Sequence, residues 1–197
     1  MNQLITTTDL TAIIPEIILI ITALCVLALE MMRLSRASVS LIVSSLGLVA
    51  AGLVVIQGNI YDEVLFGGML KLNKYSIYFD ILYLLAGLMT LVFSHGYLIK
   101  KGTKYKGEYP ALILFSVIGM MLMTRANDLI ILFLGLELLS LSLYVLVGFL
   151  RNNLLSNEAG IKYLLLGAFA TGFFLFGAAM TYGATGSTNY NEIALAI

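Results

Sequence analysis

The stretch of sequence that decides the fold is residues 128–150, which read DLIILFLGLELLSLSLYVLVGFL. A bilayer core of about 30 Å needs roughly 20 helical residues to cross it, and this stretch has that length. It must be helical, because lipid offers the backbone no hydrogen-bond partner. The only charged side chain between its ends is Glu137, about 13 Å along the helix from Asp128. The stretch therefore predicts a transmembrane helix with a carboxyl group near its middle.

The rest of the chain has the same character. Hydrophobic residues make up 60% of the sequence, charged residues make up 11%, and the mean hydropathy is +1.01. A soluble domain carries about 25% charged residues. This chain carries less than half of that, which is too few to give its helices a water-soluble surface. The sequence predicts an all-α polytopic membrane protein with about six transmembrane helices. Five further spans are predicted at Thr11–Met32, Ala37–Gln57, Tyr75–Ile99, Tyr109–Thr124 and Ala159–Thr185.

Basic residues predict the orientation, because loops on the inner side carry an excess of lysine and arginine. The connections after the first, third and fifth spans hold seven of them, and the opposite side holds three. We therefore expect both ends of the chain to face outward. The first set is Arg33, Arg36, Lys100, Lys101, Lys104, Lys106 and Arg151, and the second is Lys71, Lys74 and Arg125.

Several classes of protein are excluded by what the sequence lacks. Eleven basic and eleven acidic residues give a net charge of zero, so there is no basic surface for nucleic acid. The single cysteine, Cys25, forms no CxxC pair, so we expect no zinc or iron–sulfur site in this chain. No GxGxxG motif follows a strand, which argues against a dinucleotide-binding fold.

Glu137 is the first candidate site residue. Ser140 and Tyr144 follow at i+3 and i+7, so one helix face carries a carboxyl, a hydroxyl and a phenol, and that face should point into the protein. One interpretation is a neutral, hydrogen-bonded acid that only fixes helix packing. The other is a proton carrier, because a carboxyl group removed from water can load and unload a proton near neutral pH.

Lys162 is the second candidate, and it lies a turn or more inside the sixth span. Glu158 at i−4 offers a local ion pair worth about 0.3–0.5 kcal/mol, which is one interpretation. The other is a proton relay or an electrostatic partner of Glu137, from which it should lie roughly 10 Å away in depth. Glu16, Glu30 and Asp80 lie near span ends and are expected to anchor the helices at the membrane surface.

Three ordered blocks resemble a known family. They are GLELLSLSLYVLVGF at 135–149, SNEAGIKYLLLGAF at 156–169 and YGATGST at 182–188, with weaker likeness upstream at Pro15 and at Phe79-Asp80. Together they resemble the antiporter-like membrane subunits of respiratory complex I, the subunit called 2 in mitochondria and N in bacteria. The resemblance covers essentially the whole chain.

The resemblance implies a fold of three peripheral helices followed by two inverted five-helix repeats. It divides this chain into residues 1–107, with the first three helices, and residues 108–197, with helices four to six of the chain and the first part of one repeat. Glu137 matches the family's glutamate and Lys162 its sixth-helix lysine. The family has about fourteen helices and this chain stops after the sixth, so we expect a split subunit completed by a second chain, or else a fragment.

The resemblance also implies a function: proton translocation by a Glu/Lys relay coupled to quinone reduction by NADH:ubiquinone oxidoreductase. No redox centre is expected here, since NADH, FMN, iron–sulfur clusters and ubiquinone would be bound by partner subunits. The expected partners are other membrane-arm subunits, the second chain and membrane lipid. The expected location is the mitochondrial inner membrane, or alternatively the bacterial plasma membrane. A subunit of a multi-protein cation/proton antiporter and a structural remnant are the alternative functions.

Overall fold

A computed structural model describes residues 6–32, 37–58, 63–100 and 107–197 of the chain. Within these residues, six helices are long and apolar enough to cross a membrane, which confirms the predicted fold class. Arg33, Arg36, Lys101, Lys104 and Lys106, on which the predicted orientation mainly depends, lie outside the described residues. The six helices are α2 (Ile14–Met31), α3 (Ala37–Gln57), α4 (Lys74–Lys100), α5 (Glu108–Arg125), α6 (Leu129–Val147) and α7 (Leu154–Thr185).

Local chemistry sets where these helices begin. Pro15 lies in the first turn of α2, where its missing N–H costs nothing, and a break at Ile13 separates α2 from the short helix α1 (Thr7–Ala12). The first predicted span, which began at Thr11, is therefore interrupted. Asn153 caps α7 by accepting hydrogen bonds from the N–H groups of Leu155 and Ser156. As a result, α7 begins about one turn earlier than the predicted Ala159.

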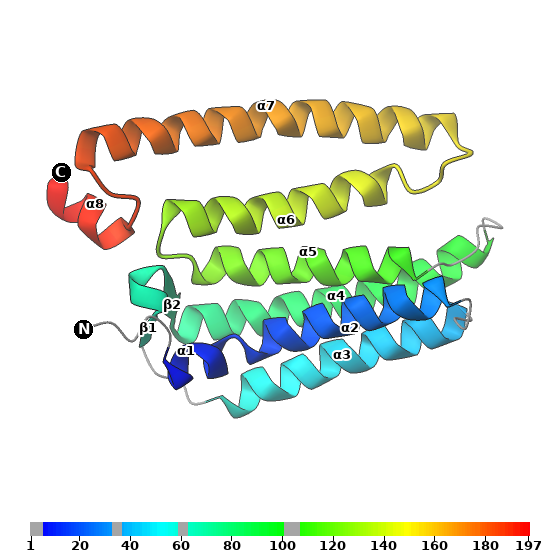
Figure 1. The fold of residues 1–197 in the computed structure, drawn as a ribbon. Coiled ribbons are helices and arrows are strands. Elements are labelled where there is room, and N and C mark those ends of the chain that lie inside the picture. The colour runs from blue at the N-terminus through cyan, green and yellow to red at the C-terminus, as the bar shows by residue number, and fades with distance from the viewer. Residues whose placement is uncertain (1–5, 33–36, 59–62, 101–106) are drawn as a thin grey trace.

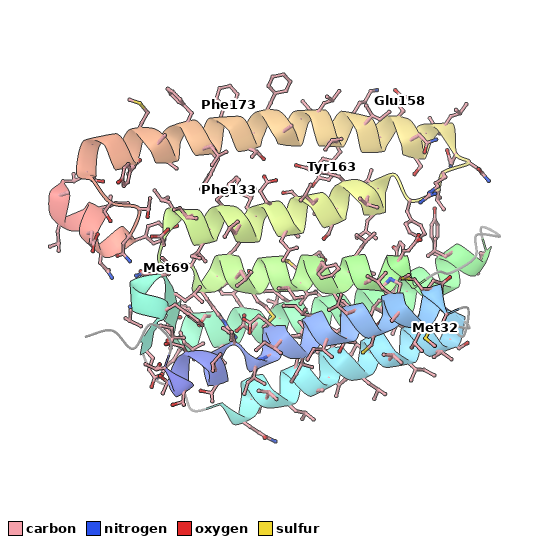
Figure 2. All side chains as sticks on the ribbon, viewed as in Figure 1. Met32, Met69, Phe133, Glu158, Tyr163 and Phe173 are labelled. Atoms are coloured by element: carbon pink, nitrogen blue, oxygen red, sulfur yellow. The ribbon has the colours of Figure 1, made fainter. Side chains whose placement is uncertain are left out.

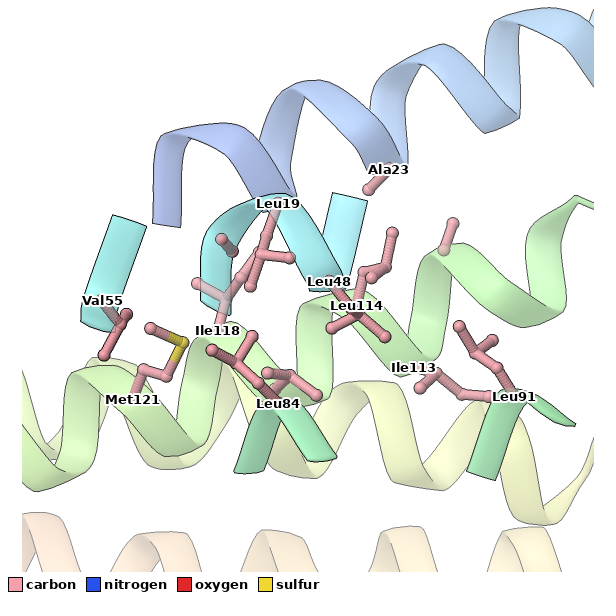
Figure 3. Close-up of a cluster of buried hydrophobic side chains, with 13 residues drawn as sticks. Leu19, Ala23, Leu48, Val55, Leu84, Leu91, Ile113, Leu114, Ile118 and Met121 are labelled. Atoms are coloured by element: carbon pink, nitrogen blue, oxygen red, sulfur yellow. The ribbon is translucent and has the colours of Figure 1, made fainter. Parts of the chain in front are cut away.

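The helices form a layered bundle in which α5 is central (Figure 1). On one side, α5 packs against α2 and α4. Helix α3 packs against these two helices, mainly on their side away from α5. Figure 3 shows the buried apolar side chains that fill this part of the bundle, among them Leu19, Leu48, Leu84, Leu114 and Ile118. On the other side α5 packs against α6, and α7 follows α6 at the edge of the molecule.

Two glycines bring α5 and α6 into backbone contact. A Cβ atom added at Gly119 would lie 2.7 Å from both the carbonyl oxygen of Gly135 and the amide nitrogen of Leu139. A Cβ atom added at Gly135 would lie 2.9 Å from the carbonyl oxygen of Gly119. Only glycine fits at this crossing, and the close approach holds α6, with Glu137, firmly on the core.

A small hairpin closes one end of the bundle, which we call the hairpin end. Its strands β1 (Glu63–Leu65) and β2 (Leu70–Leu72) pair antiparallel around a 3-10 turn, η1 (Phe66–Gly68). The side-chain amides of Asn127 and Asn189 both donate to the carbonyl oxygen of Gly68, at 2.8 Å each. These bonds join the hairpin to the start of α6 and to the segment between α7 and the last helix, α8 (Tyr190–Ala196).

Candidate functional site

Glu137 lies near the middle of α6 on the face that meets α7. Asp128 caps α6 by accepting from the N–H of Ile130 at 2.8 Å, which fixes where the helix begins. The Glu137 side chain is partly buried, and its Oε1 accepts a hydrogen bond of 2.6 Å from the hydroxyl of Thr171 on α7. The carboxyl group of a helix long enough to span a membrane is thus turned toward the neighbouring helix α7. Thr171 was not predicted, because a lone threonine in an apolar run gives no signal of its partner.

The phenol of Tyr144 continues the same α6–α7 face. Its ring contacts Tyr163 of α7 edge to face, with centroids 5.0 Å apart and planes at 87°. The phenol also fills the space beside Gly167, where an added Cβ atom would overlap it. Glu137 and Tyr144 therefore both contact α7, and they share one face of α6 as the i, i+7 spacing predicted. Ser140 is partly buried.

Lys162 lies on α7, but at a different level along the helix axis from Glu137. Its ammonium group pairs with Glu158 one turn earlier, and both side chains are largely exposed, at 69% and 58%. Thr171, which marks the level of Glu137, is nine residues further along α7, about 14 Å along the helix axis. Among the described residues, no hydrogen bond or ion pair joins Lys162 to Glu137. The local pair with Glu158 is thus present, and a relay role for Lys162 stays a prediction.

The expectation that Glu16 and Asp80 anchor helices at the membrane surface is wrong. Both carboxyl groups are buried at the hairpin end of the bundle, with side-chain exposures of 5% and 0%. Both carboxyl groups contact Arg125, the last residue of α5, whose side chain is 3% exposed. The predicted orientation counted Arg125 as a residue of a connecting loop, and that assumption is wrong. Its guanidinium joins Asp80 at 2.5 Å and Glu16 at 2.6 Å.

The physical reason is that a charge near a span end need not reach water when an opposite charge lies at the same level of a neighbouring helix. Glu16 is in the first turn of α2, Asp80 is in the second turn of α4, and Arg125 is in the last turn of α5. Opposite charges at matching ends of adjacent spans were the signal in the sequence that could have found this cluster. Glu30 differs, since it is partly buried and accepts from the N–H of Gly107 at 3.2 Å.

Comparison with known proteins adds the family. A family model described as NADH:quinone oxidoreductase/Mrp antiporter, transmembrane, matches residues 126–197. The chain is 42% identical over 193 residues to NADH-quinone oxidoreductase subunit N of Trichlorobacter lovleyi, which covers 98% of this chain and 39% of that protein. It is 54% identical over 128 residues to subunit N 2 of Roseiflexus castenholzii, which covers 65% of this chain and 26% of that protein.

Two solved structures share the fold. A chain of respiratory complex I from Thermus thermophilus superimposes with a TM-score of 0.73 at 28% identity, over 89% of this chain and 38% of that chain. A chain of the membrane-bound sulfane sulfur reductase, an archaeal respiratory membrane complex, gives the same TM-score of 0.73 over 95% of this chain and 40% of that one. Its 21% identity makes this second likeness one of fold alone.

The six-helix bundle, with a carboxyl group held between α6 and α7, thus has the architecture of an antiporter-like membrane subunit, and residues 126–197 match the model of that family. Within the family its relatives are the N subunits of NADH-quinone oxidoreductases. The chain spans 39% of the length of the Trichlorobacter relative, which fits the N-terminal part of such a subunit.

Proposed function

We propose that this chain is part of a proton-translocating membrane subunit of an NADH:quinone oxidoreductase, and that Glu137 carries the proton within it. One observation carries the proposal: the carboxyl group lies in the middle of a membrane-spanning helix, faces α7, and accepts a 2.6 Å hydrogen bond from Thr171. Charged groups at this depth cost about 2.5–3.5 kcal/mol on insertion scales, which is why they mark transport paths.

The local chemistry suits a group that gains and loses a proton. A threonine hydroxyl can donate to the carboxylate and can also accept from the protonated carboxylic acid, so the pair stays hydrogen-bonded in both states. Tyr144 supplies a second hydroxyl along the same face of α6, towards the level of Lys162. Redox chemistry in partner subunits would drive transport by shifting the populations of the two protonation states. These partners, and not this chain, would bind NADH, FMN, iron–sulfur clusters and ubiquinone.

The proton path needs further helices, which we propose lie against α7. No residue of α7 is fully buried, and Phe173, on the side that faces away from α6, is 76% exposed (Figure 2). Gly172 and Gly177 face open space, where a neighbouring helix could approach closely. The chain spans 39% of the Trichlorobacter relative and 26% of the Roseiflexus relative, so we propose that the further helices belong either to a companion chain or to a longer form of this protein.

The surroundings follow from the relatives. Those named above are bacterial, which favours the bacterial plasma membrane over the mitochondrial inner membrane as the location. The partners would be other membrane-arm subunits, with lipid around the remaining helices. The family description also includes Mrp antiporters, so a subunit of a multi-protein cation/proton antiporter is the second candidate. Co-purification with flavin and iron–sulfur subunits would favour the first function over the second.

Substitution of Lys162 tests whether the relay includes it. We expect Lys162→Ala to lower NADH-driven proton pumping in membrane vesicles more than it lowers the amount of assembled complex. The matched control is Glu158→Gln, which removes the local ion pair and leaves the lysine. An equal loss of pumping in both variants would support the local ion pair and contradict a relay through Lys162.

A further inference from the structure

The buried charges at the hairpin end of the bundle do not balance. Glu16 and Asp80 offer two negative charges and Arg125 offers one positive charge, so with both acids ionised the cluster would carry a net charge of −1. An uncompensated charge out of water is strongly unfavourable. Among the described residues, the surrounding elements do not supply the missing positive charge. Helix α3 has no titratable residue, Lys71 of β2 and Lys74 at the start of α4 are exposed, and Tyr83 of α4 is a phenol that accepts from Thr124.

Arg125 is shared unequally between the two acids. Asp80 Oδ2 accepts from its Nε at 3.0 Å and from its Nη2 at 2.5 Å, so two charge-assisted hydrogen bonds hold this carboxylate. Its Nη1 donates instead to the carbonyl oxygen of Ala12 at 2.8 Å. Glu16 Oε1 lies 2.6 Å from Nη1, but neither Glu16 oxygen has a hydrogen-bond partner among the described residues. The charge of Glu16 is therefore the less compensated of the two.

Water has room to reach this cluster. A cavity of about 80 Å³ lies beside it, lined by Arg125, by Pro15 next to Glu16, and by Thr11 of α1. A single water molecule needs only about 10–15 Å³ when measured in the same way. A water molecule in the cavity would contact Arg125, with which Glu16 is paired, and could exchange a proton with the cluster.

We propose that Glu16 is a proton-binding site, which holds one proton at neutral pH while Asp80 and Arg125 remain an ion pair. The proton comes from water and adds to a carboxylate oxygen of Glu16, and the cluster becomes electrically neutral. The site lies on α2, apart from Glu137 on α6, and does not depend on the function proposed for Glu137. It stores a proton inside the membrane part of the bundle, next to a cavity at the hairpin end that is large enough for water.

Infrared spectroscopy of the intact complex in membranes tests this directly, through the C=O stretch of a protonated carboxyl group. At neutral pH we expect a band that shifts when glutamate is isotope-labelled and is missing in Glu16→Gln, beside any bands from other protonated carboxyl groups of the complex. Asp80→Asn should remove the same band although Glu16 is still present, because the freed guanidinium would then pair with Glu16 and favour its ionised form. The control, Glu30→Gln, should leave the band in place.

Two results would overturn the proposal. If neither Glu16→Gln nor Asp80→Asn removes a glutamic acid band, Glu16 is ionised and the proton site does not exist. If replacing sodium by choline lowers the unfolding temperature of the wild type but not that of Glu16→Gln, a metal cation neutralises the cluster instead. Should Glu16→Gln fail to assemble, loss of the labelled band in Asp80→Asn decides the question.

Discussion

At the scale of single residues, Asp9 joins two distant parts of the chain at the hairpin end. Its Oδ2 accepts from the N–H and the hydroxyl of Thr6, at 2.7 Å each, and caps α1. Its Oδ1 accepts from the N–H of Phe66 at 2.9 Å. Phe66 has a φ of 50°, a left-handed conformation that costs a bulky residue about 1–3 kcal/mol unless its surroundings hold it there. The hydrogen bond to Asp9 is one contact that holds Phe66 in this conformation.

The hydrogen bond between the Asp9 carboxylate and the N–H of Phe66 should depend on pH. Hydrogen bonds from the backbone of Thr6, then from the backbone of Phe66 and the side chain of Thr6, lower the pKa of Asp9 below its ordinary 3.8. A lowered pKa means that the stabilisation is fully present above 3.8 and is lost as the pH falls through the lowered value. We expect Asp9→Asn to reduce the hydrogen-exchange protection of the Phe66 amide at neutral pH, and the difference from wild type to vanish in acid. Equal protection at neutral pH would contradict this role.

Single-residue chemistry was the part least accessible from sequence. The depth of Glu137 and its helix face followed from spacing alone, because a helix has a fixed rise and period. Its partner Thr171 did not, since hydrogen bonds between helices depend on packing that no local pattern encodes. Glu16, Asp80 and Arg125 were assigned to the surface for the same reason: each was considered on its own helix, and their burial depends on meeting one another.

At the scale of elements, the helices were largely predictable and their ends were not. Long apolar runs predicted the six spans, because the bilayer demands a fixed length of helix. The start of α7 was missed because the predicted span began at Ala159, whereas the cap at Asn153 extends the helix back through the polar residues before Ala159. The closest helix pairing, α5 with α6, was also missed, because Gly119 and Gly135 lie on different spans and neither alone indicates contact.

The crossing of α5 and α6 should not tolerate a methyl group. Gly119→Ala would place a carbon 2.7 Å from the backbone of α6, which must then move away from the core. We expect a loss of about 1–3 kcal/mol in the free energy of unfolding, measured on the protein in lipid. Gly96→Ala is the control, because nothing lies within 4 Å of its added Cβ atom, and its helix should gain up to about 1 kcal/mol. Equal stability of both variants would contradict the close crossing.

At the scale of the whole molecule, the exposed face of α7 is where we propose that another helix docks. A larger side chain at Gly172 should block the approach of another helix without disturbing α2 to α6, because nothing described in the chain lies near it. We expect Gly172→Leu to lower the amount of this chain that co-purifies with the membrane complex, and Gly96→Leu to leave it unchanged. If lipid covers this face, Gly172→Leu will assemble normally, and the proposal of helices docked on α7 fails.

The central claim is that the carboxyl group of Glu137 carries protons, and Glu137→Gln tests it most directly. Glutamine keeps the shape of the side chain and a hydrogen-bond acceptor for Thr171, but it cannot take up and release a proton. The measurement is the number of protons pumped per NADH oxidised by membrane vesicles that contain equal amounts of assembled complex. The account predicts that this ratio falls in Glu137→Gln while the complex still assembles. An undiminished ratio would contradict it and leave Glu137 as a buried acid that only fixes the packing of α6 on α7.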